Sequence, residues 1–172
     1  MQFCKILNME RRDIFDDCGS WLTWTGFLFA RAGNNLRDDA QFDMEERVLA
    51  SKSATCIVRK DDAFRQLGGF DSGYYILGEE TDLSWRVWLQ DSKVLFCPKA
   101  VGYHAFNTSM KPAKDYYTSK RVHYNGCRNY ITMLLKNLET HNLWRILPIH
   151  CFLWFSAGLA MIGTLKVRQG FG

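Results

Sequence analysis

An α/β fold followed by C-terminal helices is the architecture that the sequence predicts, from three observations. Apolar, β-branched segments alternate with helical ones between about Val48 and Phe106, a pattern typical of α/β layers. Acidic residues at Glu79 open an amphipathic helix within this region. After Pro112 the apolar residues recur at helical spacing. We therefore expect an α/β domain over residues 1–110 and a helical part over residues 111–172.

The composition is that of a folded domain. At 172 residues, with 47% hydrophobic and 15% aromatic residues, the chain is long enough to bury a core, which argues against disorder. Its six cysteines show no C-x-x-C pair and no metal-finger spacing. We expect buried, reduced thiols in a cytosolic setting, with disulfides left open. Residues 1–8 lack the basic start and the long apolar run of a secretory signal.

Charge is divided unevenly along the chain. Residues 1–98 hold 12 Lys and Arg against 16 Asp and Glu, whereas residues 99–172 hold 10 against 2. The basic second part suits an anionic membrane surface or a phosphate-bearing substrate. We expect no nucleic-acid partner, because no recognised binding motif accompanies the charge.

The first part of the chain is predicted to combine short strands with polar loops. Strands are expected at Phe3–Leu7 and Ala54–Val58, with a polar surface loop at Gly33–Glu46 between them. Three acids after the first strand offer metal ligands, although a solvated loop or helix start is their commoner role: Asp13, Asp16 and Asp17. Two tryptophans could stack on a sugar or a base, although packing in the core is the usual role: Trp21 and Trp24.

A short helix and a tight turn are expected next. The helix should begin at Asp61, with Asp61 or Asp62 as its cap, and end at Leu67. Gly68 and Gly69 then supply the permissive backbone angles of a turn.

A second helix and a strand follow this turn. The helix is predicted over Glu79–Gln90, where Asp82 and Arg86 lie one turn apart and can pair. A short strand is predicted at Lys93–Phe96, ended by Pro98.

Two further helical segments complete the chain. Asp115–Leu138 has a basic polar side, so it is either a solvated surface helix or a helix in contact with a membrane. Leu147–Leu165 holds no formally charged residue at neutral pH and has the ~19 residues that a membrane span needs. A full span, a shallow interfacial or re-entrant helix and a buried core helix all remain open for it.

The acids at the start of the second helix have a structural and a functional interpretation. Carboxylates at a helix N-terminus complement the macrodipole, which is a purely structural role. The surrounding order of motifs favours function, because the chain reads LGGFDSGYYILGEETDLSWRVWL from Leu67 and a histidine follows the next strand.

This order resembles the second half of the catalytic domain of family-two inverting glycosyltransferases, which have the GT-A fold. Those enzymes carry a G-G-F-D turn, an acidic E-D-x-D-L-x-x-R segment and a later histidine. The matching residues are Gly68, Gly69, Phe70, Asp71, Glu79, Glu80, Asp82, Leu83, Arg86 and His104. A helix with the pattern R-N…K-N follows the core in many bacterial members, and it is matched by Arg128, Asn129, Lys136 and Asn137. The likeness covers about Lys5 to Asn137.

The resemblance implies transfer of a sugar, with inversion, from a nucleotide-sugar donor to a hydroxyl of a glycan or lipid-linked acceptor. It implies a place in cell-surface polysaccharide biosynthesis at the cytoplasmic face of a membrane. Glu80 occupies the position of the family's general base, which is usually an aspartate, and the alternatives are Glu79 and Asp82. The implied substrate-binding residues are Gly69, Asp71, Tyr74, Trp85 and Arg86. His104 matches a histidine that ligates the metal in some members, so the implied cofactor is Mn²⁺ or Mg²⁺.

Some parts of the family pattern do not occur in this sequence. It contains no D-x-D triplet, no G-x-G-x-x-G and no P-loop motif to hold a nucleotide sugar. We therefore expect a fragment, the acceptor-side half of such an enzyme, which does not turn over nucleotide sugars alone. Two other classes stay open. One is an inactive glycan-binding module that presents Tyr74–Leu77, and the other is a membrane-associated assembly protein whose functional part follows Asp115.

Overall fold

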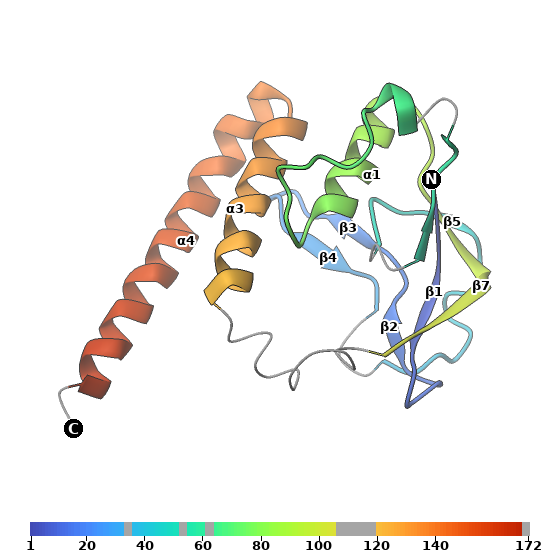
Figure 1. Cartoon of the computed structure of the whole chain (residues 1–172), viewed down its shortest axis with the longest axis horizontal. Helices are drawn as coiled ribbons and strands as arrows, with labels where there is room; N and C mark the ends of the chain where they lie inside the picture. The colour runs from blue at the N-terminus through green and yellow to red at the C-terminus, as the bar shows by residue number, and fades with distance from the viewer. Residues whose placement is uncertain (33–35, 52–54, 61–63, 106–119, 170–172) are drawn as a thin grey trace.

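The chain forms a mixed α/β structure in which the strands lie on one side and the helices α1, α3 and α4 lie beside them (Figure 1). The computed structural model describes residues 1–32, 36–51, 55–60, 64–105 and 120–169, with side chains as far as residue 160. The helices are α1 (Glu79–Leu89), α3 (Lys120–Asn137) and α4 (Thr140–Gln169). The predicted α/β class with C-terminal helices is thereby confirmed.

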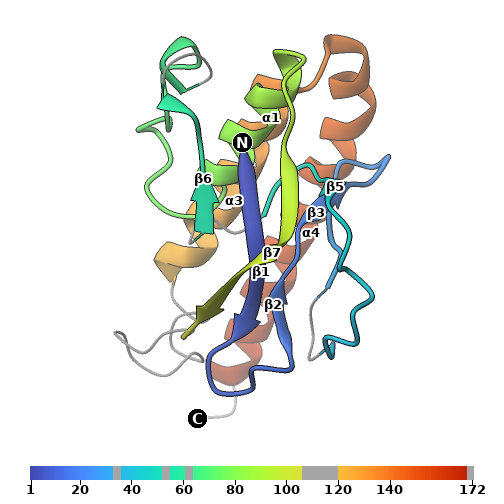
Figure 2. The same ribbon diagram turned by 90° about the vertical axis from the view of Figure 1, so that its right-hand side faces the viewer.

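The main sheet has five strands, in the order β2-β1-β7-β5, with β6 also paired to β1. Their bounds are β1 Gln2–Asn8, β2 Phe15–Asp17, β5 Glu46–Arg47, β6 Cys56–Ile57 and β7 Leu95–His104. β1 and β7 run parallel along one another, and the other pairs are antiparallel (Figure 2). The predicted strand at the N-terminus is therefore the central strand of the sheet.

A second, two-stranded sheet is a hairpin of β3 (Ser20–Leu22) and β4 (Leu28–Ala30). Its turn is fastened to the C-terminal helices, because the Tyr130 hydroxyl of α3 donates to the carbonyl of Gly26 at 2.7 Å. His150 of α4 is fully buried, and its Nε2 lies 2.9 Å from the carbonyl oxygen of Thr25. Gly26 has φ +80°, and a Cβ there would lie 2.5 Å from Ile146, so this close approach requires glycine.

Two apolar clusters hold the layers together. One joins the main sheet to the base of α1 and contains Phe3, Leu7, Phe15, Cys18, Ala32, Val48, Val87, Val94 and Phe96. The other joins α1 to α3 and to the first turns of α4 and contains Leu49, Ala50, Tyr74, Trp85, Met133, Leu134 and Ile146. Helix α3 and the first turns of α4, from the part predicted to be helical, thus pack against α1 in the second cluster.

The prediction that Pro98 ends the strand is wrong, because β7 continues to His104. Its pairing with β1 shifts register at this point, from Cys4 opposite Cys97 to Lys5 opposite Val101. The residues between these two pairs form a bulge, and proline has no N–H to donate to a ladder. β7 can therefore continue beyond Pro98, because the residue at this bulge does not have to donate a hydrogen bond to β1.

The segment predicted as an acidic loop or helix start instead contains β2 and β3. Asp17 on β2 is buried, and its Oδ2 accepts a hydrogen bond from the Ser51 hydroxyl. Core packing is the wrong assignment for Trp24, whose side chain is 79% exposed, and Trp21 is also exposed.

The polar segment before β5 is tied to the sheet. Lys5 is buried in β1, and its Nζ lies 2.8 Å from Asp38 Oδ2 and 2.6 Å from Asp43 Oδ1. All six cysteines are free, as expected, but only Cys18 is fully buried.

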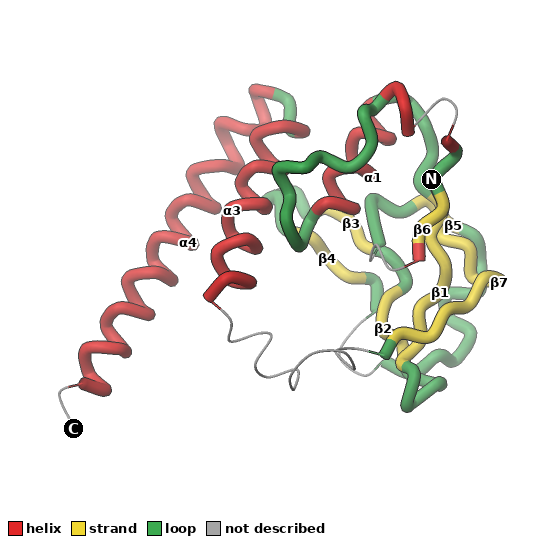
Figure 3. The backbone as a smooth tube through the Cα atoms, viewed as in Figure 1, coloured by secondary structure: helices red, strands yellow, loops and turns green. Residues whose placement is uncertain are grey.

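The apolar C-terminal stretch lies within α4, a single helix that contains Pro148 (Figure 3). A buried core helix is the wrong alternative for it, because only 11% of the window Thr140–Ala160 is buried. Among the described residues, this window is the one helical segment long and apolar enough to cross a membrane.

Four predictions fall partly outside the described residues. These are the first residues of the surface loop at 33–46, of the short helix at 61–67, of the strand at 54–58 and of the helix at 115–138. The strand is seen as β6 and the C-terminal helix as α3, which begins at Lys120.

Candidate functional site

Helix α1 begins at a tight turn that α3 holds in place. Leu77 and Gly78 both have left-handed backbone angles, with φ of 72° and 89°. For leucine this conformation costs roughly 1–2 kcal/mol, so neighbouring contacts must compensate. Asn129 of α3 supplies them, because its Nδ2 donates to the carbonyl oxygens of Ile76 and Leu77, each at 2.8 Å. A residue of the R-N…K-N pattern thereby fixes where the acidic helix starts.

Two carboxylates, Glu79 and Glu80, begin helix α1. Burial, together with the negative charges of Glu79 and Asp17, raises the pKa of Glu80 to about 7, against a lowering by its own backbone N–H. Glu79 Oε2 is also buried, with no hydrogen-bond partner in the described part of the chain. A carboxyl group that titrates near neutral pH can exchange a proton with a bound ligand.

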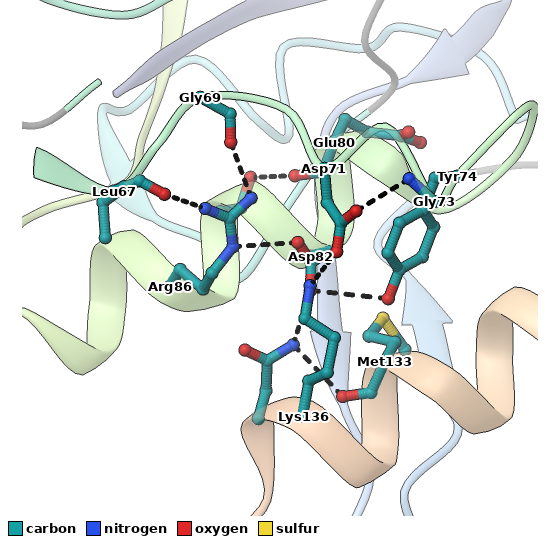
Figure 4. Close-up of polar contacts among 12 residues, drawn as sticks. Leu67, Gly69, Asp71, Gly73, Tyr74, Glu80, Asp82, Arg86, Met133 and Lys136 are labelled. Atoms are coloured by element: carbon teal, nitrogen blue, oxygen red, sulfur yellow. Dashed lines mark hydrogen bonds and ion pairs between the residues drawn. The ribbon is translucent and has the colours of Figure 1, made fainter. Parts of the chain in front are cut away.

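Two residues further on, Asp82 is fully buried inside a cationic and amide shell (Figure 4). Its Oδ2 accepts a hydrogen bond from Arg86 Nε at 2.8 Å. Its Oδ1 accepts one from Asn137 Nδ2 at 3.0 Å and lies 3.0 Å from Lys136 Nζ. The Tyr74 hydroxyl lies 3.4 Å from the same oxygen. The carboxylate of Asp82 is therefore committed to internal contacts.

The same shell fastens the glycine turn before α1. Arg86 donates from its two terminal nitrogens to the carbonyl oxygens of Leu67, at 2.6 Å, and Gly69, at 2.8 Å. Lys136 Nζ lies 2.6 Å from Asp71 Oδ2, and the Asp71 side chain also accepts from the backbone N–H of Gly73. The Lys136 ammonium and the Gly73 N–H hold the pKa of Asp71 below its usual range. These contacts bring together motif residues that the sequence places far apart.

The five residues predicted to bind substrate lie in or beside this network. Tyr74 and Trp85 are buried in the core cluster that joins α1 to α3. The predicted pairing of Asp82 with Arg86 is confirmed, but as a buried pair and not as an exposed one. Asn129 and Asn137 of the R-N…K-N pattern are buried and point at the α1 segment, whereas the basic residues of the helix are exposed: Lys120, Arg121, His123 and Arg128.

A cavity of about 330 Å³ opens beside the first turn of α1. Its walls come from α1, α3, α4 and the β3–β4 hairpin. They are formed by Leu28, Leu77, Gly78, Glu80, Thr81, Gly126, Asn129, Tyr130, Met133 and Trp154. Glu80 is the one ionisable carboxylate among these residues. A ligand in the cavity would therefore meet a single acid against walls that are mainly apolar.

His104 lies at the end of β7, away from any complete set of metal ligands in the described residues. Its Nδ1 is 2.9 Å from Asp16 Oδ2. Within the described ranges, no three His, Cys, Asp or Glu side chains come together as a metal-binding group. The described residues around His104 thus do not form a ligand set for the divalent cation that the resemblance implies.

Sequence reasoning missed two contributors to this site and assigned a third to another role. Asp17 was predicted as a metal ligand or a solvated acid, whereas in the fold its charge helps to raise the pKa of Glu80. Trp154 lines the cavity from α4, in a stretch whose apolar composition hides it. Gly126 is the residue that carried a signal, because a glycine inside a predicted helix usually has a packing or functional reason.

Comparisons with known proteins give a limited result. No protein-family model and no curated protein sequence matches the chain. Among solved structures, the crystal structure of GalNAc-T7 with UDP, GalNAc and Mn²⁺ is similar, with a TM-score of 0.46 and 16% sequence identity. The alignment covers 77% of this chain and 25% of that one, so the chain spans about a quarter of that protein's length. At this identity and TM-score the likeness does not by itself assign the chain to a family.

Proposed function

We propose that this chain is the acceptor-side part of a glycosyltransferase of the GT-A fold, which transfers a sugar from a nucleotide-sugar donor with inversion. Glu80 carries the proposal. Its carboxyl group stands at the start of α1, at the wall of a cavity, with a pKa of about 7. The convergence of the two resembling motifs supports it, because Lys136 contacts both Asp71 and Asp82.

In the proposed reaction, Glu80 takes the proton from the attacking hydroxyl of the acceptor. The hydroxyl oxygen forms a bond to the anomeric carbon while the bond to the nucleoside diphosphate breaks, and its electron pair leaves with the diphosphate. One in-line displacement of this kind inverts the configuration at that carbon. A carboxylate with a pKa near 7 is a stronger base than an ordinary glutamate and is still largely ionised at slightly alkaline pH.

The remainder of the site positions this base. Asp82 fixes the first turn of α1 through Arg86 and α3, and Asn129 fixes the turn at which the helix begins. Such rigidity matters, because an error of about 1 Å in a reacting group costs on the order of a hundredfold in rate. No step is assigned to His104.

The test is sugar transfer by Glu80→Gln. The full-length natural protein that contains this chain is purified and assayed for nucleoside diphosphate release with a panel of sugar donors and acceptors. Because the change removes the proton acceptor and keeps the size, we expect the rate to fall by on the order of 10²–10⁴-fold. The matched control is Glu79→Gln, which we expect to stay within about tenfold of the wild type.

Two outcomes would contradict the assignment. Equal rates for Glu80→Gln and the wild type would remove Glu80 from the role of base. Sugar binding without any diphosphate release would favour the inactive glycan-binding module instead.

We also propose that α4 attaches the protein to the cytoplasmic face of a membrane. One face of the helix is apolar and exposed at four positions spaced by whole turns: Trp144, Phe152, Phe155 and Leu159. Trp24, on the hairpin turn that contacts α4, is exposed as well, and tryptophan favours membrane–water interfaces. Burying such residues in lipid is worth roughly 1.5–3 kcal/mol each.

Liposome flotation tests this attachment with a matched pair of surface variants. Phe152→Ser with Phe155→Ser should lose most of the bound fraction, because both side chains are exposed and leave the core intact. Met44→Ser is the control, since Met44 is 73% exposed and lies far from α4 in the sequence. Binding should be stronger with anionic lipid and weaker in salt. Flotation of the double variant at the wild-type level would contradict the proposal.

A further inference from the structure

The cavity beside α1 has walls suited to hydrocarbon more than to sugar. Leu28, Leu77, Met133 and Trp154 supply apolar surface from four different elements. Its volume of about 330 Å³ lies at the lower end of the range for small-ligand sites. A carbohydrate in such a space would lose water from many hydroxyl groups and would need a partner for each of them.

Two polar groups in the walls are already engaged by the protein. The Asn129 amide nitrogen donates to the carbonyl oxygens of Ile76 and Leu77. The Tyr130 hydroxyl donates to the carbonyl of Gly26 and accepts from the N–H of Leu28 at 2.8 Å. Because these two groups already make hydrogen bonds within the protein, the cavity walls suit a ligand that forms few hydrogen bonds.

Helix α3 contributes a glycine to the cavity wall. Gly126 lies within the helix, where glycine costs roughly 1 kcal/mol relative to alanine. A Cβ built at Gly126 would lie 3.6 Å from Leu77 Cδ1, which is ordinary contact, so the backbone does not require glycine here. A larger side chain at this position would project into the cavity.

One residue of the cavity wall reaches the surface of α4. Trp154 lines the cavity and is itself 39% exposed. Phe155, the next residue of the helix, is 68% exposed. Glu80, the acid proposed as the base, lines the same cavity. An amphiphile would therefore have its polar end at Glu80 and its chain directed toward α4.

We infer that this cavity takes the apolar part of a lipid-linked acceptor, whose attacking hydroxyl lies at Glu80 and whose chain leaves past Trp154. The inference rests on the proposed transferase function and narrows its acceptor from a glycan or a lipid-linked sugar to the second. The pKa of Glu80, raised by burial, agrees with an apolar group seated beside it.

Binding of an alkyl glucoside tests the cavity without a donor and without turnover. Octyl glucoside, kept below its micelle-forming concentration, is titrated into the protein by calorimetry, with glucose as the polar control. We expect the wild type and Gly126→Ala to bind octyl glucoside and to show no binding of glucose. Gly126→Phe should bind at least tenfold more weakly, because its ring fills the cavity. Phe152→Ser with Phe155→Ser should still bind, since the cavity is intact.

The outcomes separate the cavity from its alternatives. Unchanged binding by Gly126→Phe, or equal binding of glucose and octyl glucoside, would overturn the inference. Gly126→Leu repeats the test with a smaller side chain if the phenylalanine variant melts below the wild type. Because octyl glucoside binding is measured without a donor and without turnover, loss of transfer in Glu80→Gln and loss of binding in Gly126→Phe report on the proposed function and on the cavity separately.

Discussion

Two carboxylic acids in the first turn of α1, Glu80 and Asp82, lie in opposite surroundings. Asp82 faces α3 and is matched by Arg86, Lys136 and Asn137. Glu80 lies two residues earlier and meets Glu79 and Asp17 instead, so its carboxyl group keeps a proton to a higher pH. On a helix, two positions apart means opposite faces. Which acid serves structure and which serves chemistry is therefore decided by the neighbouring element, not by the helix itself.

The largest expected effect is the loss of stability in Asp82→Asn. Removing the charge leaves Arg86 and Lys136 beside a neutral group in a buried site, and breaking a buried pair costs about 3–5 kcal/mol. This is more than the loss of under about 1 kcal/mol that an exposed pair would predict. Urea unfolding at neutral pH measures it. A change of less than about 1 kcal/mol would mean that the network contributes little.

A smaller effect, of opposite sign, is expected for Glu80→Gln. In the unfolded chain this carboxyl titrates near its ordinary value of 4.5, and in the folded chain at about 7. The folded state therefore binds the proton more tightly, and the penalty for ionising Glu80 grows from about pH 4.5 to pH 7 and stays constant above. The variant should gain roughly 1–3 kcal/mol over the wild type at pH 8 and nothing at pH 4. Unfolding curves of both proteins at the two pH values check this, and an equal difference at both would refute it.

The smallest effect is expected at an exposed pair that serves as the control for Asp82. Asp13 Oδ2 lies 3.1 Å from Arg37 Nε, with side chains 53% and 67% exposed. Asp13→Asn should cost under about 1 kcal/mol, because water and salt screen such pairs. The same urea unfolding experiment applies. If this variant loses as much as Asp82→Asn, burial does not explain the difference between the two sites.

Much of the fold could be predicted from local sequence signals. The apolar run at the N-terminus marks β1, and the acids at Glu79 mark the start of α1, which ends within one residue of the prediction. The continuation of β7 past Pro98 could not be predicted, because the bulge that admits proline belongs to the pairing with β1. Local rules describe one strand, whereas a register shift is a property of two.

The candidate site could be predicted only in part, for the same reason. The motif order pointed to Glu80 and to the pairing of Asp82 with Arg86. Whether an acid is neutralised or isolated depends on residues from distant segments, such as Lys136 and Asp17. The exposure of Trp24 was not predicted, because tryptophan side chains are usually buried. This general tendency does not show which hairpin turn faces solvent.

The parallel pairing of β1 with β7 also bears on how the protein folds. Gln2 and Leu95 are neighbours in the sheet, although nearly the whole α/β part of the chain lies between them in sequence. Closing so long a loop costs entropy before any contact repays it, and folds dominated by such pairings form slowly. During synthesis, β1 emerges first and must wait for β7 before its edge is covered. Until then its apolar residues, Phe3, Ile6 and Leu7, are exposed to aggregation, so a nascent chain halted before Leu95 should be a client of chaperones.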